Sequence, residues 1–263
     1  MDLGLQGKVV AVAAASKGLG KVVALRLAQE GACVGICARS AESAQRAAKE
    51  IQAQTGARAL AVAADLTRAQ DVQRFVEATA AQFGGLDALV CNAGGPPSGT
   101  FADVDDAAWE AAFQLTLMSV VRLCRAALPH FKARGAGRIA VIASVSIKQP
   151  IDNLILSNSL RMAVLGLSKS LANEYASDKI TVNCVCPGYI ETDRLNELFQ
   201  TRAAQMNVSL EDVKSYMAQT VPLRRLGQPQ ELADVVALLC SARAGYLTGA
   251  SIQLDGGITK GYA

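Results

Sequence analysis

The sequence predicts a three-layer α/β domain built on a doubly wound parallel sheet of about seven strands. Short strand-like runs and longer helix-like runs alternate from one end of the chain to the other. The strand-like runs are apolar throughout rather than alternating, which is typical of parallel strands with helices on both faces. Right-handed crossovers then make the sheet doubly wound. No linker or repeat breaks the alternation, so we expect residues 1–263 to form a single domain.

The first half of the chain begins with an apolar run after Gly7 and ends before a loop rich in glycine and proline, 93–99. Ser40 is a good N-cap for the second helix, and Gly56 follows its last turn. In order, we expect a strand at 8–14, a helix that stops at Gly31, a strand at 33–38, a helix at 40–56, a strand at 58–65, a helix at 71–83 and a strand at 86–92.

The second half continues the same alternation after this loop. A segment at 188–228, rich in apolar side chains, interrupts it before the last helix. We expect a long helix at 109–133, a strand at 137–144, a helix near 155–176, a strand at 179–186, a helix at 229–240 and a last strand within 249–257.

Composition and charge exclude several function classes. The net charge is +3 and no basic block is present, so we expect no nucleic-acid partner. The seven cysteines include no C-x-x-C pair, and His130 is the only histidine, so we expect no zinc site and buried free thiols, as in a reducing cytoplasm. We expect neither a signal peptide nor a membrane span, and a cytoplasmic location.

In a doubly wound sheet, ligands bind at the carboxyl ends of the strands. The first loop at this edge, "AAASKGLG" at 13–20, is called the cofactor turn below. Gly18 and Gly20 would let the backbone approach a pyrophosphate at a helix N-terminus. By itself such a turn is weak support, because it is as often only a tight turn.

Further motifs stand at this edge in a fixed order. They are "CNAG" at 91–94, Ser144 at the end of the fifth strand, "PGYIETD" at 187–193 and "LDGG" at 254–257. Taken together, they make the chain resemble the short-chain dehydrogenase/reductase (SDR) family, most closely its β-ketoacyl carrier-protein reductase-like branch. The resemblance runs from about Leu5 to Gly257 and implies a Rossmann-type fold.

The resemblance implies a dinucleotide site and a hydride transfer between nicotinamide and a carbonyl or alcohol carbon. One departure is that Ala14 stands where the family usually has its first glycine, so a positive φ there would be strained. The residues implied to bind the cofactor are Ala14, Ser16, Lys17, Gly18, Leu19, Gly20, Arg39, Asp65, Leu66, Asn92, Ala93, Gly94, Arg161, Pro187, Gly188, Ile190 and Thr192.

Two basic residues favour NADP(H) over NAD(H). Arg39 follows the second strand, where the ribose 2′ position is expected, and an arginine suits a 2′-phosphate. Lys17 lies in the cofactor turn and can reach the same phosphate. Either residue could instead be an ordinary solvated surface charge.

The catalytic positions depart further from the family pattern. Ser144 matches the family serine, but thirteen residues later stands Ser157 instead of tyrosine, and four residues beyond it Arg161 replaces lysine. Thr116 stands where the family has asparagine. A serine hydroxyl is a much weaker acid than a phenol, and arginine cannot relay a proton because it does not deprotonate. Tyr189, Lys148 and Tyr216 are candidate substitute proton donors, although ordinary loop or lid packing is the stronger reading for each.

These departures leave more than one function open. The first hypothesis is an NADP(H)-dependent oxidoreductase, with a 3-oxoacyl-type substrate as one possibility; the second is a catalytically impaired or noncatalytic NADP(H)-binding protein with a regulatory role. A lyase- or isomerase-type activity in the same pocket is a weaker third. The apolar residues of 188–228, read as a substrate lid, fit an apolar carbonyl or acyl substrate, although a helix pair packed on the body would show the same pattern.

The resemblance also implies a homodimer or homotetramer that pairs through the helices 109–133 and 155–176. The second helix carries small residues that permit close approach, namely Ala163, Gly166 and Ser170.

Overall fold

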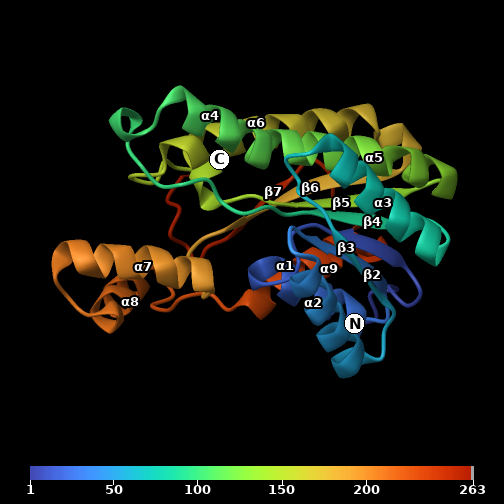
Figure 1. Ribbon diagram of the computed structural model, residues 1–263, viewed down its shortest axis with the longest axis horizontal. Helices are drawn as coiled ribbons and strands as arrows, with labels where there is room; N and C mark the ends of the chain where they lie inside the picture. Colours follow the sequence, from blue (N-terminus) through green and yellow to red (C-terminus); the bar gives the residue numbers. More distant parts are fainter. Residues whose placement is uncertain (262–263) are drawn as a thin grey trace.

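The computed structural model describes residues 1–261 and contains a seven-stranded parallel sheet in the order β3-β2-β1-β4-β5-β6-β7 (Figure 1). The chain starts in the middle of the sheet, moves outward to β3 and returns to place β4 beside β1. The predicted doubly wound fold is therefore confirmed. The strands are β1 Val9–Val12, β2 Cys33–Ala38, β3 Ala59–Ala63, β4 Ala88–Cys91, β5 Gly137–Ile142, β6 Ile180–Pro187 and β7 Ser251–Leu254.

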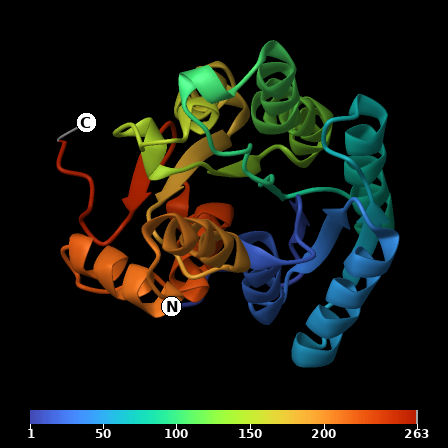
Figure 2. The same ribbon diagram turned by 60° about the vertical axis from the view of Figure 1, so that its left-hand side comes forward.

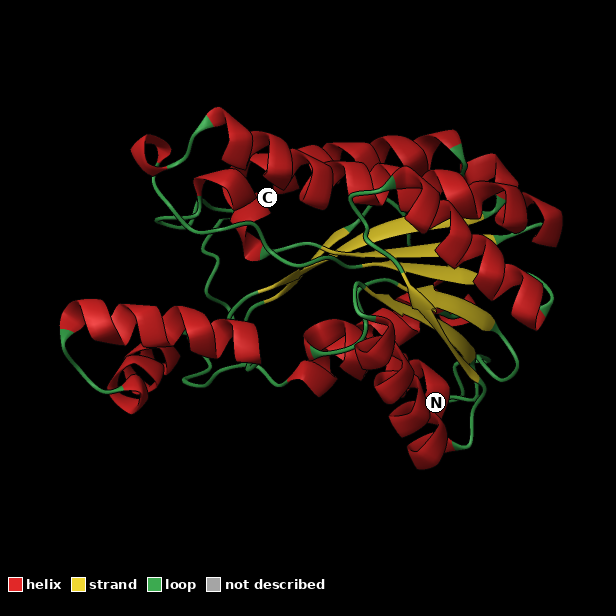
Figure 3. Cartoon of the chain, viewed as in Figure 1, coloured by secondary structure: helices red, strands yellow, loops and turns green. Residues whose placement is uncertain are grey.

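Helices cover both faces of this sheet, which makes the three layers visible in Figures 1 and 3. Helices α1, α2 and α9 lie on one face, and α3, α4, α5 and α6 lie on the other. The helices of the two layers are α1 Gly18–Gln29, α2 Ala41–Thr55, α3 Ala69–Phe83, α4 Asp106–Phe113, α5 Ser119–Arg134, α6 Ile155–Glu174 and α9 Pro229–Cys240.

The two faces of the sheet carry separate hydrophobic cores, and β1 shows why its sequence is apolar throughout. Val9 and Ala11 pack into the core under α3, α5 and α6, whereas Val10 and Val12 pack into the core under α1 and α9. Because successive side chains of a strand point to opposite faces, a strand buried on both sides needs apolar residues at every position.

Between β6 and α9 the chain forms a helical hairpin of α7 Asp193–Met206 and α8 Leu210–Thr220, here called the lid hairpin. It projects from the body beside the end of β6 (Figures 1 and 2). Phe199, Val213 and Met217 are buried in a small core of their own between its helices. The sequence left two alternatives for this segment, a substrate lid and a helix pair packed on the body. The segment is a pair of helices with a small core of its own.

Several predicted boundaries were wrong by a few residues. The helix predicted at 109–133 begins earlier, at Asp106, and is divided by a π-helical turn, Gln114–Met118. The helix predicted at 71–83 begins at Ala69, and strands predicted at 58–65 and 137–144 are shorter. Asp105 accounts for the early start of α4, because its side chain accepts a hydrogen bond from Ala108 N and caps the first turn.

Within residues 1–261, the continuous helical stretch 106–134 is long and apolar enough to span a membrane by length and composition alone. Leu123, Cys124 and Phe131 of this stretch are buried against the sheet, as in the core helix of a soluble domain.

Candidate functional site

The cofactor turn connects β1 to α1 at the point where the chain order of the sheet reverses, between β1 and β4. Its backbone is held from both sides: Ala13 N donates to Val90 O at 3.0 Å, and Ala15 N donates to Cys37 O at 2.9 Å. Such a switch point is where doubly wound sheets bind their ligands.

A close approach at the start of α1 requires Gly20. A Cβ atom at this position would lie 2.5 Å from Ala14 O and 2.7 Å from Asn92 Nδ2. Asn92 itself donates from Nδ2 to Ala14 O at 3.1 Å and to Ala13 O at 3.3 Å. The asparagine after β4 therefore fastens the cofactor turn to the neighbouring strand.

Ala14 adopts the left-handed conformation that its position in the turn demands, with φ +49°. This region favours glycine, because a Cβ there crowds the backbone. The suspected strain is therefore present, and the turn keeps its shape without a glycine at its first position.

The turn suits a phosphate group. Among residues 1–261, no side chain caps the start of α1, whose N-cap residue is Lys17, so the first backbone N–H groups of the helix remain available. Gly18, with φ +58°, leaves the place of a Cβ open: apart from adjacent residues and nearby helix backbone, no atom of the described chain lies within 4 Å of it. Free N–H donors at a helix N-terminus beside an open backbone fit a dinucleotide pyrophosphate.

The two basic residues expected near a 2′-phosphate lie at this edge. Lys17 and Arg39 are exposed, and among the described residues neither has a carboxylate oxygen within 4.0 Å. Asp65 follows β3, and its Oδ1 accepts hydrogen bonds from Thr67 N at 2.9 Å and Thr67 Oγ1 at 2.8 Å. Leu66 beside it is buried in the core.

The residues at three of the family's catalytic positions lie on α6 and just after β5: the matching Ser144 and the altered Ser157 and Arg161. Ser144 caps a 3₁₀ turn, Val145–Ile147, by accepting from Ser146 N at 3.1 Å. Arg161 donates from Nε to Ser157 Oγ at 3.1 Å and from Nη1 to Ala143 O at 2.9 Å and Ile142 O at 3.3 Å. The arginine thus ties α6 to the last residues of β5, next to Ser144.

The environment of Arg161 is unusual for a cation. Burial lowers the pKa of its guanidinium, which nevertheless remains charged because an arginine is not deprotonated in proteins. No carboxylate oxygen lies within 4.0 Å of it among residues 1–261; its hydrogen-bond acceptors there are a serine hydroxyl and two backbone carbonyls. Ser157 is only 8% exposed, so its hydroxyl is a partner of Arg161 more than a group open to solvent.

Thr116 lies on the π-helical turn between α4 and α5, with 5% of its surface exposed. Its Oγ1 is buried and has no hydrogen-bond partner within the described chain. Thr116 and Arg161 line the same small hollow, together with residues 92–94. Three of the altered positions, 116, 157 and 161, are therefore close in space.

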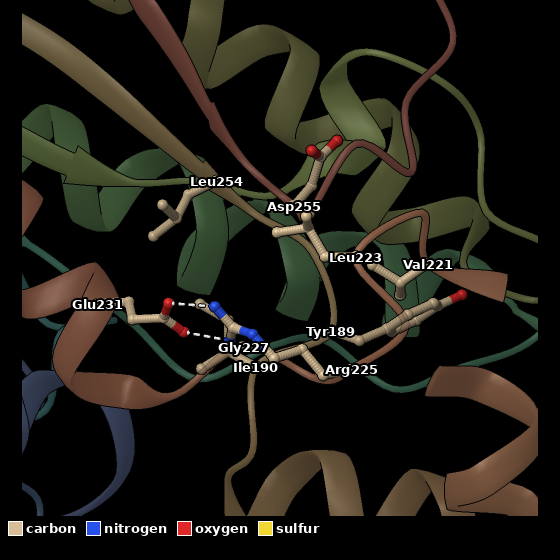
Figure 4. A pocket seen from close by; sticks show the side chains of 10 residues that line it. Tyr189, Ile190, Val221, Leu223, Arg225, Gly227, Glu231, Leu254 and Asp255 are labelled. Carbon is tan, nitrogen blue, oxygen red and sulfur yellow. Dashed lines mark hydrogen bonds and ion pairs between the residues drawn. The ribbon is translucent and has the colours of Figure 1, made fainter. Parts of the chain in front are cut away.

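Tyr189 lies apart from this group. Its ring packs at the base of the lid hairpin, with its centroid 6.1 Å from that of Phe199, and burial raises the pKa of its hydroxyl. Figure 4 shows it at the rim of a hollow of about 80 Å³, away from the ion pair of Arg225 with Glu231. The sequence motifs did not predict the hollow beside Tyr189.

The remaining residues implied to flank the nicotinamide form the start of the lid segment. Pro187 ends β6, and Gly188 N donates to Leu254 O at 2.9 Å. A Cβ on Gly188 would lie 2.9 Å from Asp255 Cα, so this glycine allows β6 and β7 to end side by side. Thr192 caps α7 by accepting from Leu195 N at 3.2 Å.

Sequence reasoning missed contacts that join segments far apart in the chain. Arg194 of α7 donates from Nη2 to Pro96 O at 3.4 Å, so the lid hairpin touches the loop after β4. Arg225 and Glu231 form a bidentate pair at 2.6 and 2.8 Å, which joins the segment after α8 to the first turn of α9. Neither pair has helical or strand spacing, so no local pattern could have indicated it.

The fold and this edge define a doubly wound α/β domain of the dinucleotide-binding type. A family model described as enoyl-(acyl carrier protein) reductase matches residues 13–259. Dehydrogenase/reductase SDR family member 4 of Oryctolagus cuniculus is 34% identical over 254 residues, which cover 96% of this chain and 94% of that relative.

Two solved structures extend this similarity. L-Sorbose reductase from Gluconobacter frateurii, in complex with NADPH and L-sorbose, is 34% identical with a TM-score of 0.95, covering 99% of this chain and 100% of that one. A short-chain oxidoreductase from Pseudomonas aeruginosa PAO1, bound to NADPH and described as containing an atypical catalytic centre, is 31% identical with a TM-score of 0.89, covering 97% and 98%. The chain belongs to the short-chain dehydrogenase/reductase family.

Proposed function

We propose that this protein is an NADP(H)-dependent oxidoreductase that acts on a carbonyl or alcohol carbon with altered catalytic groups. The proposal rests on one observation: the cofactor turn and the residues Ser144, Ser157 and Arg161 lie at the same edge of the sheet, where its strands end. NADP(H), when bound, would supply the hydride. The NADPH-bound relatives support this choice of cofactor.

Recognition of the 2′-phosphate falls to Lys17 and Arg39. Both are exposed at the turn and at the end of β2, without a competing carboxylate among the described residues. A charge-assisted contact of this kind contributes about 1.5 to 3 kcal/mol, which corresponds to roughly ten- to a hundredfold in affinity.

The proton transfer must differ from that of a tyrosine-bearing family member. Ser157 is weakly acidic, and its oxygen already accepts a hydrogen bond from Arg161 Nε. Arg161 holds α6 against β5 and leaves the N–H groups of Nη2 for a ribose hydroxyl. We infer that Ser144 orients the substrate oxygen, and that the proton comes from a bound water or another nearby group.

Loss of a tuned acid would slow the reaction without necessarily abolishing it. General acid catalysis typically contributes ~10²- to 10⁴-fold, and orientation of the reactants can supply much of the remainder. The apolar lid hairpin favours an apolar carbonyl or acyl substrate. A noncatalytic NADP(H)-binding role is the second candidate, favoured by the hydrogen bond that Arg161 already donates to the buried Ser157 hydroxyl.

Calorimetric titration with NADPH and NADH, in parallel with NADPH oxidation against a panel of carbonyl compounds, tests these proposals. We expect tighter binding of NADPH, reduced ten- to a hundredfold by Arg39→Ala. Arg46→Ala, on the exposed face of α2, is the matched control and should leave affinity unchanged. Binding without turnover across a broad panel would favour the noncatalytic role, and equal affinity for both cofactors would overturn the preference.

We also propose a cytoplasmic homodimer or homotetramer that pairs through α5 and α6. Met162, Ala163, Gly166 and Ser170 form an exposed stripe of apolar and small residues along α6. All seven cysteines are buried and free, as suits a reducing compartment. Light scattering should give a multiple of 27.4 kDa, and Gly166→Trp should shift it toward one chain. A wild-type monomer at micromolar concentration would contradict this.

A further inference from the structure

The loop that joins the turn after Ser144 to α6, residues 148–154 and here called the bridging loop, is held by one side chain. Asn158, in the first turn of α6, accepts a hydrogen bond from Ile151 N at 3.2 Å and donates from Nδ2 to Ile151 O at 2.9 Å. Among residues 1–261, Ile151 N has no other acceptor. One amide side chain therefore engages both backbone groups of Ile151 and ties the loop to the helix that follows it.

The far end of the bridging loop is paired with the loop after β4. Gly99 N donates to Asn153 O at 2.7 Å, and Ile155 N donates to Gly99 O at 3.4 Å, so the two segments form a parallel bridge. Asn153 has a φ of +60°, a left-handed conformation that asparagine tolerates better than most residues. The position of Gly99 therefore depends on the bridging loop, and the bridging loop depends on Asn158.

The bridging loop, the loop after β4 and the lid hairpin lie at the same end of the sheet (Figure 1). Arg194 of α7 donates from Nη2 to Pro96 O at 3.4 Å, so the loop after β4 contacts the lid hairpin on one side and the bridging loop on the other. The bridging loop also connects the turn capped by Ser144 to the helix that carries Ser157. These three segments therefore form one connected rim beside the place where Ser144 would hold a substrate oxygen.

We propose that Asn158 is a positioning residue for the substrate. It fixes Ile151 and thereby sets the bridging loop, which in turn fixes Gly99. The inference rests on the proposed oxidoreductase function, because it concerns the rim beside a carbonyl substrate held by Ser144. Asn158 acts through the two loops rather than on the reacting atoms. Its loss should therefore raise KM more than it lowers kcat, since a rim that contacts substrate and transition state alike contributes to uniform binding.

Steady-state kinetics separate this role from a merely structural one. Asn158→Leu, similar in size but without either hydrogen bond, should raise KM for a carbonyl compound of the panel roughly tenfold, with kcat and NADPH affinity changed less than about threefold. Asn158→Asp keeps the acceptor but places a carboxylate oxygen against Ile151 O, so it should raise KM as well. Ser159→Ala, an exposed serine of the same turn, is the matched control and should leave KM unchanged. Unchanged KM in both Asn158 variants, with or without a lower kcat, would overturn the proposal.

Backbone amide exchange, followed by NMR spectroscopy, gives a second readout that needs no turnover. In Asn158→Leu, the amides of Ile151 and Gly99 should exchange roughly tenfold faster, whereas Ala13 N, which donates to Val90 O, should keep its rate. Unchanged exchange at Gly99 would refute the coupling of the two loops. If the wild type reduces no carbonyl compound while exchange at Gly99 still rises, the proposed function fails and the substrate role of Asn158 falls with it, whereas the coupling of the loops stands.

Discussion

Replacement of Gly20 by alanine should destabilise the protein and weaken its cofactor turn. The added methyl would lie 2.5 Å from Ala14 O and 2.7 Å from Asn92 Nδ2. These two atoms form a hydrogen bond at 3.1 Å, so the methyl intrudes on the bond that fastens the turn to β4. Ala14 O cannot retreat easily, because Ala14 is already held at a positive φ, and Asn92 Nδ2 is held by its second hydrogen bond, to Ala13 O at 3.3 Å.

The magnitude follows from three contributions. Overpacking of a close contact costs about 1 to 3 kcal/mol, and loss of the Asn92 hydrogen bond adds ~1 kcal/mol. Alanine is better than glycine by ~1 kcal/mol within a helix, and Gly20 lies in the first turn of α1. We therefore expect a net loss of about 1 to 3 kcal/mol, or a fall in the unfolding midpoint of roughly 2 to 10 °C.

Thermal unfolding followed by circular dichroism measures this loss, and calorimetric titration with NADPH shows whether the turn has moved. Gly95→Ala is the matched control, since no atom lies within 4 Å of the place its Cβ would take, and it should change stability by less than about 0.5 kcal/mol. An unchanged midpoint and unchanged affinity in Gly20→Ala would mean that the turn relaxes freely, and the reasoning would be wrong.

Four further outcomes are expected. Ala14→Gly should raise stability by up to ~1 kcal/mol in thermal unfolding, because the relief of a φ of +49° exceeds the entropic cost of glycine; a lower midpoint would contradict this. Ser157→Ala should lower turnover less than about tenfold in the NADPH-oxidation assay, and a thousandfold loss at unchanged affinity would identify Ser157 as the working acid. Hydrogen bonding to Arg225 lowers the pKa of Glu231 from 4.5 to about 2, so its contribution to stability is present above pH 4.5 and is lost as the pH falls toward 2; Glu231→Gln should flatten the unfolding midpoint over this range. Burial raises the pKa of Cys186 to about 12, so a thiol reagent at neutral pH should leave it unmodified in the folded protein and label it after denaturation.

Local patterns in the sequence determined the fold and the order of the site residues. Continuous apolar runs predicted buried parallel strands, and Ser40 and Gly56 predicted the limits of α2, where Ser40 accepts from Ser43 N and Gly56 is left-handed. The spacing from Ser144 to Ser157 to Arg161 placed the family serine and two altered residues at one edge, because a strand end and the start of the next helix meet there. These features depend on residues that are close to one another along the chain, so they can be predicted from local sequence patterns.

The tertiary structure alone decided what those residues contact. Only packing between β5, α6 and the π-helical turn shows that Arg161 donates to Ser157 and to two backbone carbonyls, and that Thr116 Oγ1 is left without a partner. Likewise, Tyr189 follows β6 in the chain, yet its ring packs against Phe199. Burial and hydrogen-bond partners come from segments far apart in sequence, so the charge balance of the site became visible only after those segments were packed together.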